Sequence, residues 1–221
     1  MTINDVSTRM QFHLWTIVPF GIALWLLAFL PYGCEQKAQQ QAPKATVTTD
    51  NLQTAYAKSI RHQRMYTRFV RQAEKEKLAN IANLYRAIAQ SESIHALNHA
   101  TLLRTRGSEP KLPDVDSIAV GTTLQTFKMA LSSEDIETES MYPNLIRTAG
   151  VEKDTVARDQ FQKSMEADAR QTELLKDASD RVGKIPKIDY YLCPGCGYII
   201  TSSSTEECPV CHAAKIRFEK V

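Results

Sequence analysis

The sequence predicts a mainly α-helical protein, a four-helix bundle followed by a small metal-binding domain at its carboxyl end. Four long stretches repeat their apolar residues at a spacing near 3.6, and four of the five cysteines lie within the last 29 residues. The 221 residues are 43% hydrophobic and 24% charged, which suits one medium domain plus a small one and argues against disorder. The formal net charge of +2 argues against a nucleic-acid partner.

The amino end predicts a membrane attachment. Residues 14–34 form an uncharged, apolar run of 21 residues, long enough to cross a hydrocarbon core of about 30 Å. We expect residues 1–34 to be a membrane anchor or signal segment, and three alternatives stay open: a retained helix, a lipoprotein leader acylated at Cys34, and a cleaved secretory signal. The Gln-rich residues 35–48 predict a flexible tether, with the body of the protein outside the cytoplasm, in the periplasm.

Four amphipathic helices are predicted between residues 49 and 182. The first begins at the capping pair Thr49 and Asp50, and the third contains Pro143, which predicts a kink. The predicted helices cover about residues 49–76, 79–104, 122–148 and 153–182. The connection over residues 107–121 is long and the other two are short, which is the connectivity expected of ferritin-like bundles.

Two pairs of polar residues lie on the predicted inner faces. Glu92-x-x-His95 lies on the second helix, on the same face as Leu84 and Ile88, and the third helix carries Glu134-x-x-Glu137. Three buried carboxylates without a cation cost several kcal/mol each. A bound metal is the natural compensation, and the alternative is that these residues lie on solvated helix faces.

The cysteines predict a metal site in residues 189–221. Two Cys-x-x-Cys pairs stand eleven residues apart, and four thiolates suit a tetrahedral iron or zinc ion. The spacing does not choose between the two metals. So short a segment cannot build an adequate apolar core, so the metal is expected to stabilise its fold. His212 is expected at the surface. The four predicted ligands are Cys193, Cys196, Cys208 and Cys211.

With these motifs, residues 49–221 resemble the rubrerythrins, which join a ferritin-like diiron domain to a rubredoxin-like iron centre. The paired glutamates followed by Met141-Tyr142-Pro143 carry much of the resemblance. The resemblance implies that a redox donor reduces the four-cysteine iron, that electrons pass to metal in the bundle and reduce peroxide there, and that bundles pair as a homodimer. The implied catalytic residues are Glu92, His95, Glu134, Glu137, Tyr66 and Tyr142, the first four of them also metal ligands.

The sequence departs from the family pattern at the bundle metal site. Ser59 stands where the family's first helix supplies a glutamate, and no histidine follows His99 before His212, so the second Glu-x-x-His of the family lacks its imidazole. Glu166 or Asp168 could supply the fourth-helix carboxylate, and Asp168 fits the inward stripe better.

The ligand count therefore suits one divalent ion better than two, and one or two irons are expected in the bundle. His62, one turn after Ser59, and His99 could enlarge the set, although a core or surface role is commoner for each. Two functions stay open. One is a membrane-anchored peroxide reductase, and the other is an electron-transfer or accessory subunit of a membrane redox complex.

Overall fold

The computed structural model describes residues 46–114, 119–201, 206–214 and 218–221. The predicted anchor and nearly all of the predicted tether lie outside these residues. Among the described helices, none combines the length and the apolar character that a membrane crossing requires.

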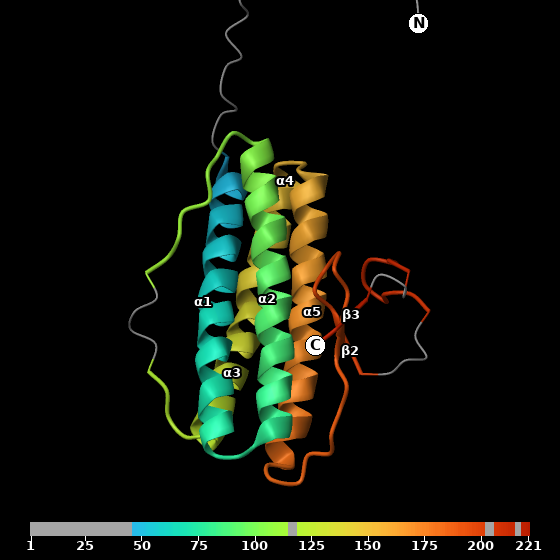
Figure 1. Ribbon diagram of the computed structural model, residues 1–221. Helices are drawn as coiled ribbons and strands as arrows, with labels where there is room; N and C mark the ends of the chain where they lie inside the picture. Colours follow the sequence, from blue (N-terminus) through green and yellow to red (C-terminus); the bar gives the residue numbers. More distant parts are fainter. Residues whose placement is uncertain (1–45, 115–118, 202–205, 215–217) are drawn as a thin grey trace, which may run out of the picture. The chain divides into compact units, whose positions relative to one another are not determined.

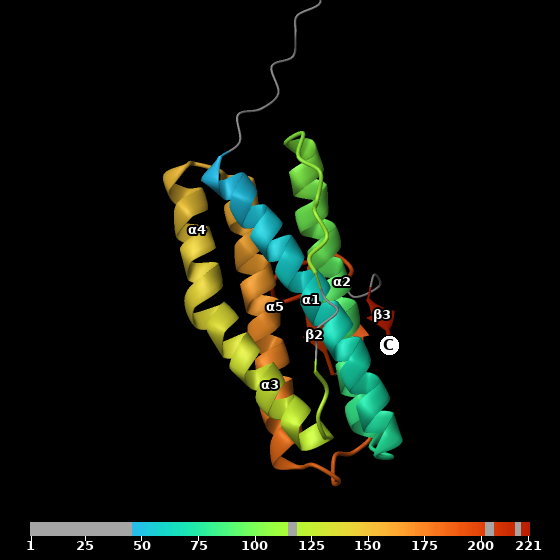
Figure 2. The same cartoon turned by 90° about the vertical axis from the view of Figure 1, so that its left-hand side faces the viewer.

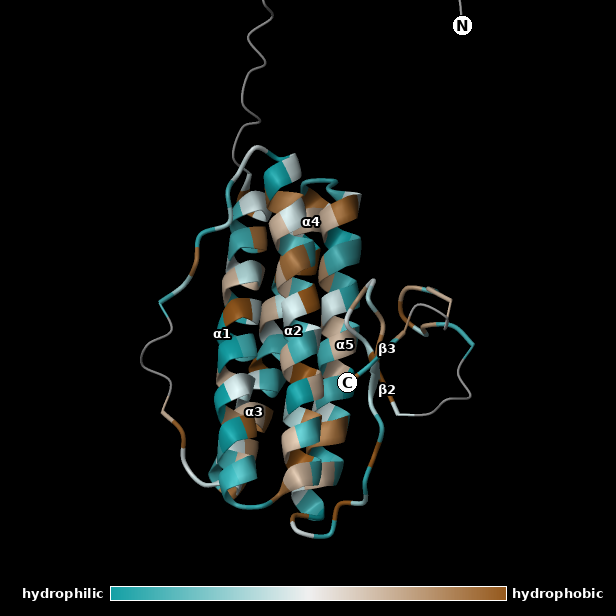
Figure 3. Ribbon diagram, in the orientation of Figure 1, coloured by the Kyte–Doolittle hydropathy of each residue, from teal (hydrophilic) through white to brown (hydrophobic). Residues whose placement is uncertain are grey.

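The described chain is a helical bundle followed by a small sheet, so the predicted fold class is confirmed (Figures 1 and 2). A broken helix takes the place of the third predicted one. The long connection after the second helix is attached to the first helix by two hydrogen bonds between Gln53 and Lys111. Teal and brown residues alternate along each helix in Figure 3, as expected of amphipathic helices. The helices are α1 (Val47–Lys75), α2 (Ala79–Thr105), α3 (Thr123–Ile136), the π-helix η1 (Glu137–Met141), α4 (Tyr142–Val151) and α5 (Thr155–Asp180).

Helix α1 begins earlier than the sequence predicts. Its N-cap is Thr46, whose hydroxyl accepts a hydrogen bond from the amide of Thr49. The predicted capping pair falls within the first turn, where Asp50 still interacts favourably with the positive end of the helix dipole.

The third predicted helix is interrupted before Pro143, where a π-helical turn separates α3 from α4. An i→i+5 turn takes up an extra residue, and such turns are a recognised cause of helix bends. Glu134 and Glu137, at the junction, are both buried. Leu124 would share the inward stripe of a continuous third helix, but in the first turn of α3 it is 55% exposed.

The bundle core has two apolar halves with a layer of buried polar residues between them. Along α1, for example, Leu52 belongs to one half, Phe69 belongs to the other, and Ser59 and His62 lie between them. The same order recurs on α2 and α5. The buried polar residues of this layer are Lys58, Ser59, His62, Ser91, Glu92, His95, His99, Glu134, Glu137, Ser164, Asp168, Gln171 and Thr172.

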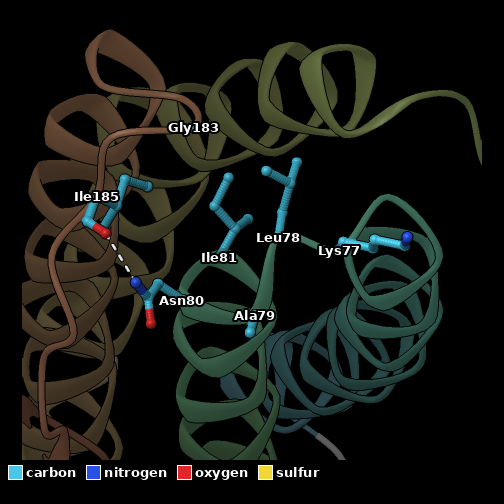
Figure 4. A pocket seen from close by; sticks show the side chains of 7 residues that line it. All are labelled: Lys77, Leu78, Ala79, Asn80, Ile81, Gly183 and Ile185. Atoms are coloured by element: carbon cyan, nitrogen blue, oxygen red, sulfur yellow. Dashed lines mark hydrogen bonds between the residues drawn. The ribbon is translucent and has the colours of Figure 1, made fainter.

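The small domain is a three-stranded antiparallel sheet with strand order β2-β1-β3. Its strands are β1 (Tyr191–Leu192), β2 (Ile199–Ile200) and β3 (Glu219–Lys220). A pocket at the turn between α1 and α2 is lined by residues 77–81 with Gly183 and Ile185, and Asn80 donates a hydrogen bond to the Ile185 carbonyl there (Figure 4). None of the residues that line this pocket belongs to the polar layer. The hydrogen bond from Asn80 holds the start of the segment that leads to the sheet.

Candidate metal centres

Lys58 lies at the centre of the polar layer. Its ammonium nitrogen is 2.8 Å from Glu92 Oε1, 2.8 Å from Glu137 Oε2 and 2.6 Å from Asp168 Oδ2. Burial by itself lowers the pKa of Lys58, but the negative charges of Asp168, Glu137 and Glu92 outweigh it and hold the pKa well above its ordinary value. Three helices and the π-turn thus meet at one buried ammonium.

Two groups of side chains around Lys58 have the composition of metal sites. Within each group, one ligand atom from every residue lies within 4.8 Å of the others. Oxygen and imidazole donors of this kind suit iron and other divalent first-row metals. The first group is Glu92, His95 and Asp168, and the second is His62, Glu134 and Glu137.

His95 connects the first group to the small domain. Its Nε2 lies 2.9 Å from the carbonyl oxygen of Cys196, and because a carbonyl can only accept, Nε2 carries the hydrogen. Nδ1 then faces Asp168 Oδ1 at 3.3 Å and Glu92 Oε2 at 3.6 Å. Burial lowers the pKa of His95, but these two carboxylates outweigh it and raise the pKa to about 10. A cation, either a proton or a metal ion, is therefore favoured at Nδ1.

His62 and Tyr66 hold the second group together. His62 Nε2 lies 2.9 Å from both Glu137 Oε1 and Ser133 Oγ, and the Tyr66 hydroxyl donates to Glu134 Oε1 at 2.7 Å. Burial raises the pKa of Glu134 to about 7, although His62 and the charge of Lys58 oppose the shift. The hydrogen-bonded pair of Tyr66 and Glu134 can therefore hold a proton inside the bundle.

The positions that depart from the family pattern also lie in this layer. Gln171, three residues after Asp168, takes the place of the missing imidazole and donates to Asp168 Oδ1 at 3.1 Å. Glu166 instead accepts a hydrogen bond from Gln162 at the surface, so the structure places Asp168 rather than Glu166 in the cluster. Ser59 is fully buried beside the group, and its hydroxyl has no hydrogen-bond partner among the described residues.

His99 and Tyr142 lie at the edge of the layer. His99 Nε2 is 3.4 Å from Ser164 Oγ, and burial lowers its pKa to about 3, which makes it a neutral core histidine. Tyr142 is fully buried, with Lys58 Nζ 5.7 Å from the centre of its ring.

The four cysteines of the small domain converge as a metal site requires. The Sγ atoms of Cys193 and Cys211 are 3.3 Å apart, and those of Cys196 and Cys208 are 3.5 Å apart. A tetrahedral ion with bonds of about 2.3 Å needs sulfur separations of roughly 3.8 Å, so a small outward shift accommodates iron or zinc. His212 is exposed beside the site, as expected.

The small domain docks on α2 through its first cysteine turn. Ser91 Oγ donates to the Gly197 carbonyl at 2.7 Å, and Asn98 donates to the Gly195 carbonyl at 2.9 Å. Gly197 has a φ of +79°, and a Cβ atom there would lie only 2.8 Å from His95 Nε2. Glycine is therefore required both by the backbone conformation and by the close approach of the bundle.

Sequence reasoning placed Glu92, His95, Glu134 and Glu137 on inner faces, and the structure brings all four into one layer. It missed Lys58, because a lysine in a helix is ordinarily solvated. The available signal was its position three residues after Ala55, on the face of α1 that also carries His62, Tyr66 and other buried residues.

Comparison with known proteins agrees with this geometry. The family model described as Rubrerythrin matches residues 50–178. Rubrerythrin-2 of Clostridium acetobutylicum is 31% identical over 182 residues, which cover 80% of this chain and 97% of the relative. Nigerythrin of Nitratidesulfovibrio vulgaris is 30% identical over 172 residues, covering 77% of this chain and 85% of the relative.

Solved structures show the same architecture. Fully reduced, all-ferrous nigerythrin superposes with a TM-score of 0.74 at 27% identity, covering 82% of this chain and 91% of that structure. The bacterioferritin of Desulfovibrio desulfuricans, which has a diiron site, shares the bundle fold with a TM-score of 0.59 at 17% identity, over 63% of this chain and 81% of that one. The described carboxylate, histidine and cysteine groups are those of a redox protein compatible with iron, and the chain belongs to the rubrerythrin family.

Proposed function

We propose that this protein is a membrane-attached peroxide reductase in which the four-cysteine centre passes electrons to the carboxylate–histidine layer. The proposal rests on the position of His95. Its Nε2 donates a hydrogen bond to the carbonyl of the cysteine ligand Cys196, and its Nδ1 faces Glu92 and Asp168. One side chain thus joins the two candidate metal centres.

Side chains in the layer can supply what peroxide reduction requires besides electrons. Reduction of one hydrogen peroxide to two waters consumes two electrons and two protons. Iron in the two centres would supply the electrons. Tyr66, hydrogen-bonded to Glu134, holds a proton beside the cluster, and the raised pKa of Glu134 allows it to store another near neutral pH. The apolar halves on either side exclude bulk water from the layer.

Reoxidation of the reduced protein by peroxide tests this function. The iron-loaded protein is reduced anaerobically and mixed with hydrogen peroxide, and the visible absorption of the oxidised four-cysteine iron is followed. Rapid return of this absorption is expected in the wild type and a large slowing in Glu92→Ala. Glu166→Ala is the matched control, because Glu166 lies on α5 outside the cluster, and it should keep the wild-type rate. Equal rates in wild type and Glu92→Ala would refute the proposal.

Electron transfer without peroxide chemistry is the second candidate function. The presence of Lys58 and Gln171 inside the layer favours it, because both stand where additional metal donors would be needed. In that case peroxide would reoxidise the wild type no faster than Glu92→Ala. A membrane redox complex would then be the partner, with the four-cysteine centre as the relay.

Membrane attachment through residues 1–34 is part of the proposal and rests on the apolar run of residues 14–34. The full chain should remain in the membrane fraction after an alkaline carbonate wash. Intact mass would then distinguish a retained segment beginning at Met1 from a lipid-modified chain beginning at Cys34. Protease sensitivity in spheroplasts should show the body on the periplasmic side. A protein recovered wholly in the soluble fraction would refute the attachment.

A further inference from the structure

We propose that the ammonium of Lys58 takes the place of one metal ion in the polar layer, so that the bundle binds a single divalent cation at Glu92, His95 and Asp168. The inference concerns metal binding and holds whether or not the protein reduces peroxide.

The two oxygens of each shared carboxylate point to different cationic positions. Lys58 contacts Glu92 through Oε1 and Asp168 through Oδ2. The opposite oxygens, Glu92 Oε2 and Asp168 Oδ1, face His95 Nδ1 at 3.6 and 3.3 Å. Two carboxylates therefore bridge two positions for positive charge, and the ammonium already fills one of them.

Two of the atoms that face the other position are satisfied by no hydrogen-bonding group of the described residues. Glu92 Oε2 and His95 Nδ1 are buried, and neither has a hydrogen-bond partner among the described residues. The hydrogen bond from Nε2 to the Cys196 carbonyl leaves Nδ1 as the nitrogen that faces both carboxylates, so a metal ion that displaces the Nδ1 proton binds there. A divalent ion at this point would gain one nitrogen and two oxygen donors, leaving open positions for water or substrate.

The His62 side of the layer is a poorer site. Glu137 is fully engaged, with Oε1 2.9 Å from His62 Nε2 and Oε2 2.8 Å from Lys58. His62 Nδ1 and Glu134 Oε2 remain without hydrogen-bond partners there, but both oxygens of Glu137, the third member of the group, already face cationic or hydrogen-bonding groups. On the His95 side the third oxygen, Asp168 Oδ1, accepts one hydrogen bond, from the neutral amide of Gln171, and a carboxylate oxygen can bind an ion besides. A second divalent ion would also have to displace the ammonium from Glu137 or lie directly against it.

Manganese binding tests how many divalent ions the bundle holds. Mn²⁺ prefers oxygen and nitrogen ligands to thiolates, so it can be titrated into the full-length protein whose four-cysteine centre carries one zinc ion. One manganese per chain with the spectrum of an isolated ion by electron paramagnetic resonance is expected. Two ions per chain, a spin-coupled pair, or no binding would each overturn the proposal.

Two further comparisons test which residues bind the ion and whether Lys58 excludes a second one. His95→Gln should weaken manganese binding at least tenfold, whereas His62→Gln should retain the ion; the reverse order would overturn the assignment. Lys58→Ala frees three carboxylate oxygens and should raise the capacity from one ion to two. A folded Lys58→Ala protein that still binds one ion would show that the lysine does not exclude the second. Circular dichroism checks folding, and if Lys58→Ala does not fold, the wild-type count and the histidine pair decide.

Discussion

Replacing Lys58 by methionine should strongly destabilise the metal-free protein. The substitution keeps most of the side-chain volume, so the cavity contribution is small, but it removes the ammonium that lies within 2.8 Å of Glu92, Glu137 and Asp168. These carboxylates are almost completely inaccessible to water, so no solvent replaces the lost partner. They must then take up protons or remain as uncompensated buried charge.

The expected loss is about 3–5 kcal/mol, the range found when one partner of a buried ion pair is removed. For a folded region of this size, 1 kcal/mol shifts the melting temperature by roughly 2–4 °C, so the midpoint should fall by roughly 6–20 °C. A divalent ion at 100 times its Kd would return about 2.7 kcal/mol. Without the ammonium, the variant has oxygens free for a second ion, which the wild type does not bind. The difference in melting temperature between wild type and variant should therefore shrink when metal is added.

Thermal unfolding at neutral pH, followed by circular dichroism in a chelator, measures this loss. Lys163→Met is the matched control. Lys163 forms an exposed pair with Asp159 on α5, and its removal should cost less than about 1 kcal/mol. A Lys58→Met protein that melts within about 2 °C of wild type in the chelator would refute the view that the ammonium compensates these carboxylates.

Three other perturbations follow from the contacts described. Gly197→Ala would place a Cβ against His95 and should slow electron transfer between the two centres while the small domain keeps its metal; unchanged transfer kinetics would contradict the contact. Asp154→Ala removes the N-cap of α5 and a hydrogen-bonded ion pair with Arg106, and should cost about 1–2 kcal/mol in a denaturant titration. Burial raises the pKa of Asp154, but the hydrogen bonds from the α5 amide and from Arg106 outweigh it and lower the pKa. The cost should therefore be fully present above about pH 4 and disappear as the pH falls through the lowered pKa; a cost that grows in acid would contradict this. Cys193→Ala should abolish metal binding and order in the small domain, as measured by metal content and proteolysis, with the bundle still helical; a metal-bound tail would contradict the four-thiolate site.

Features that depend on local spacing follow from the amino-acid sequence alone. Apolar residues at helical period predict the bundle, because the side chains of a helix share a face whatever lies opposite. Two Cys-x-x-Cys turns predict a metal site, because each turn brings its own pair of sulfurs together. The same local logic placed Glu92 and His95 on one inner face.

How these helix faces meet depends on contacts between residues that are far apart in the chain. Lys58 reaches Asp168, 110 residues away in the chain, and His95 reaches the Cys196 carbonyl, 101 residues away. The choice of Asp168 over Glu166 depends on the register of α5 against its neighbours. No local pattern contains these contacts, because a buried lysine is stable only where several distant carboxylates converge on it.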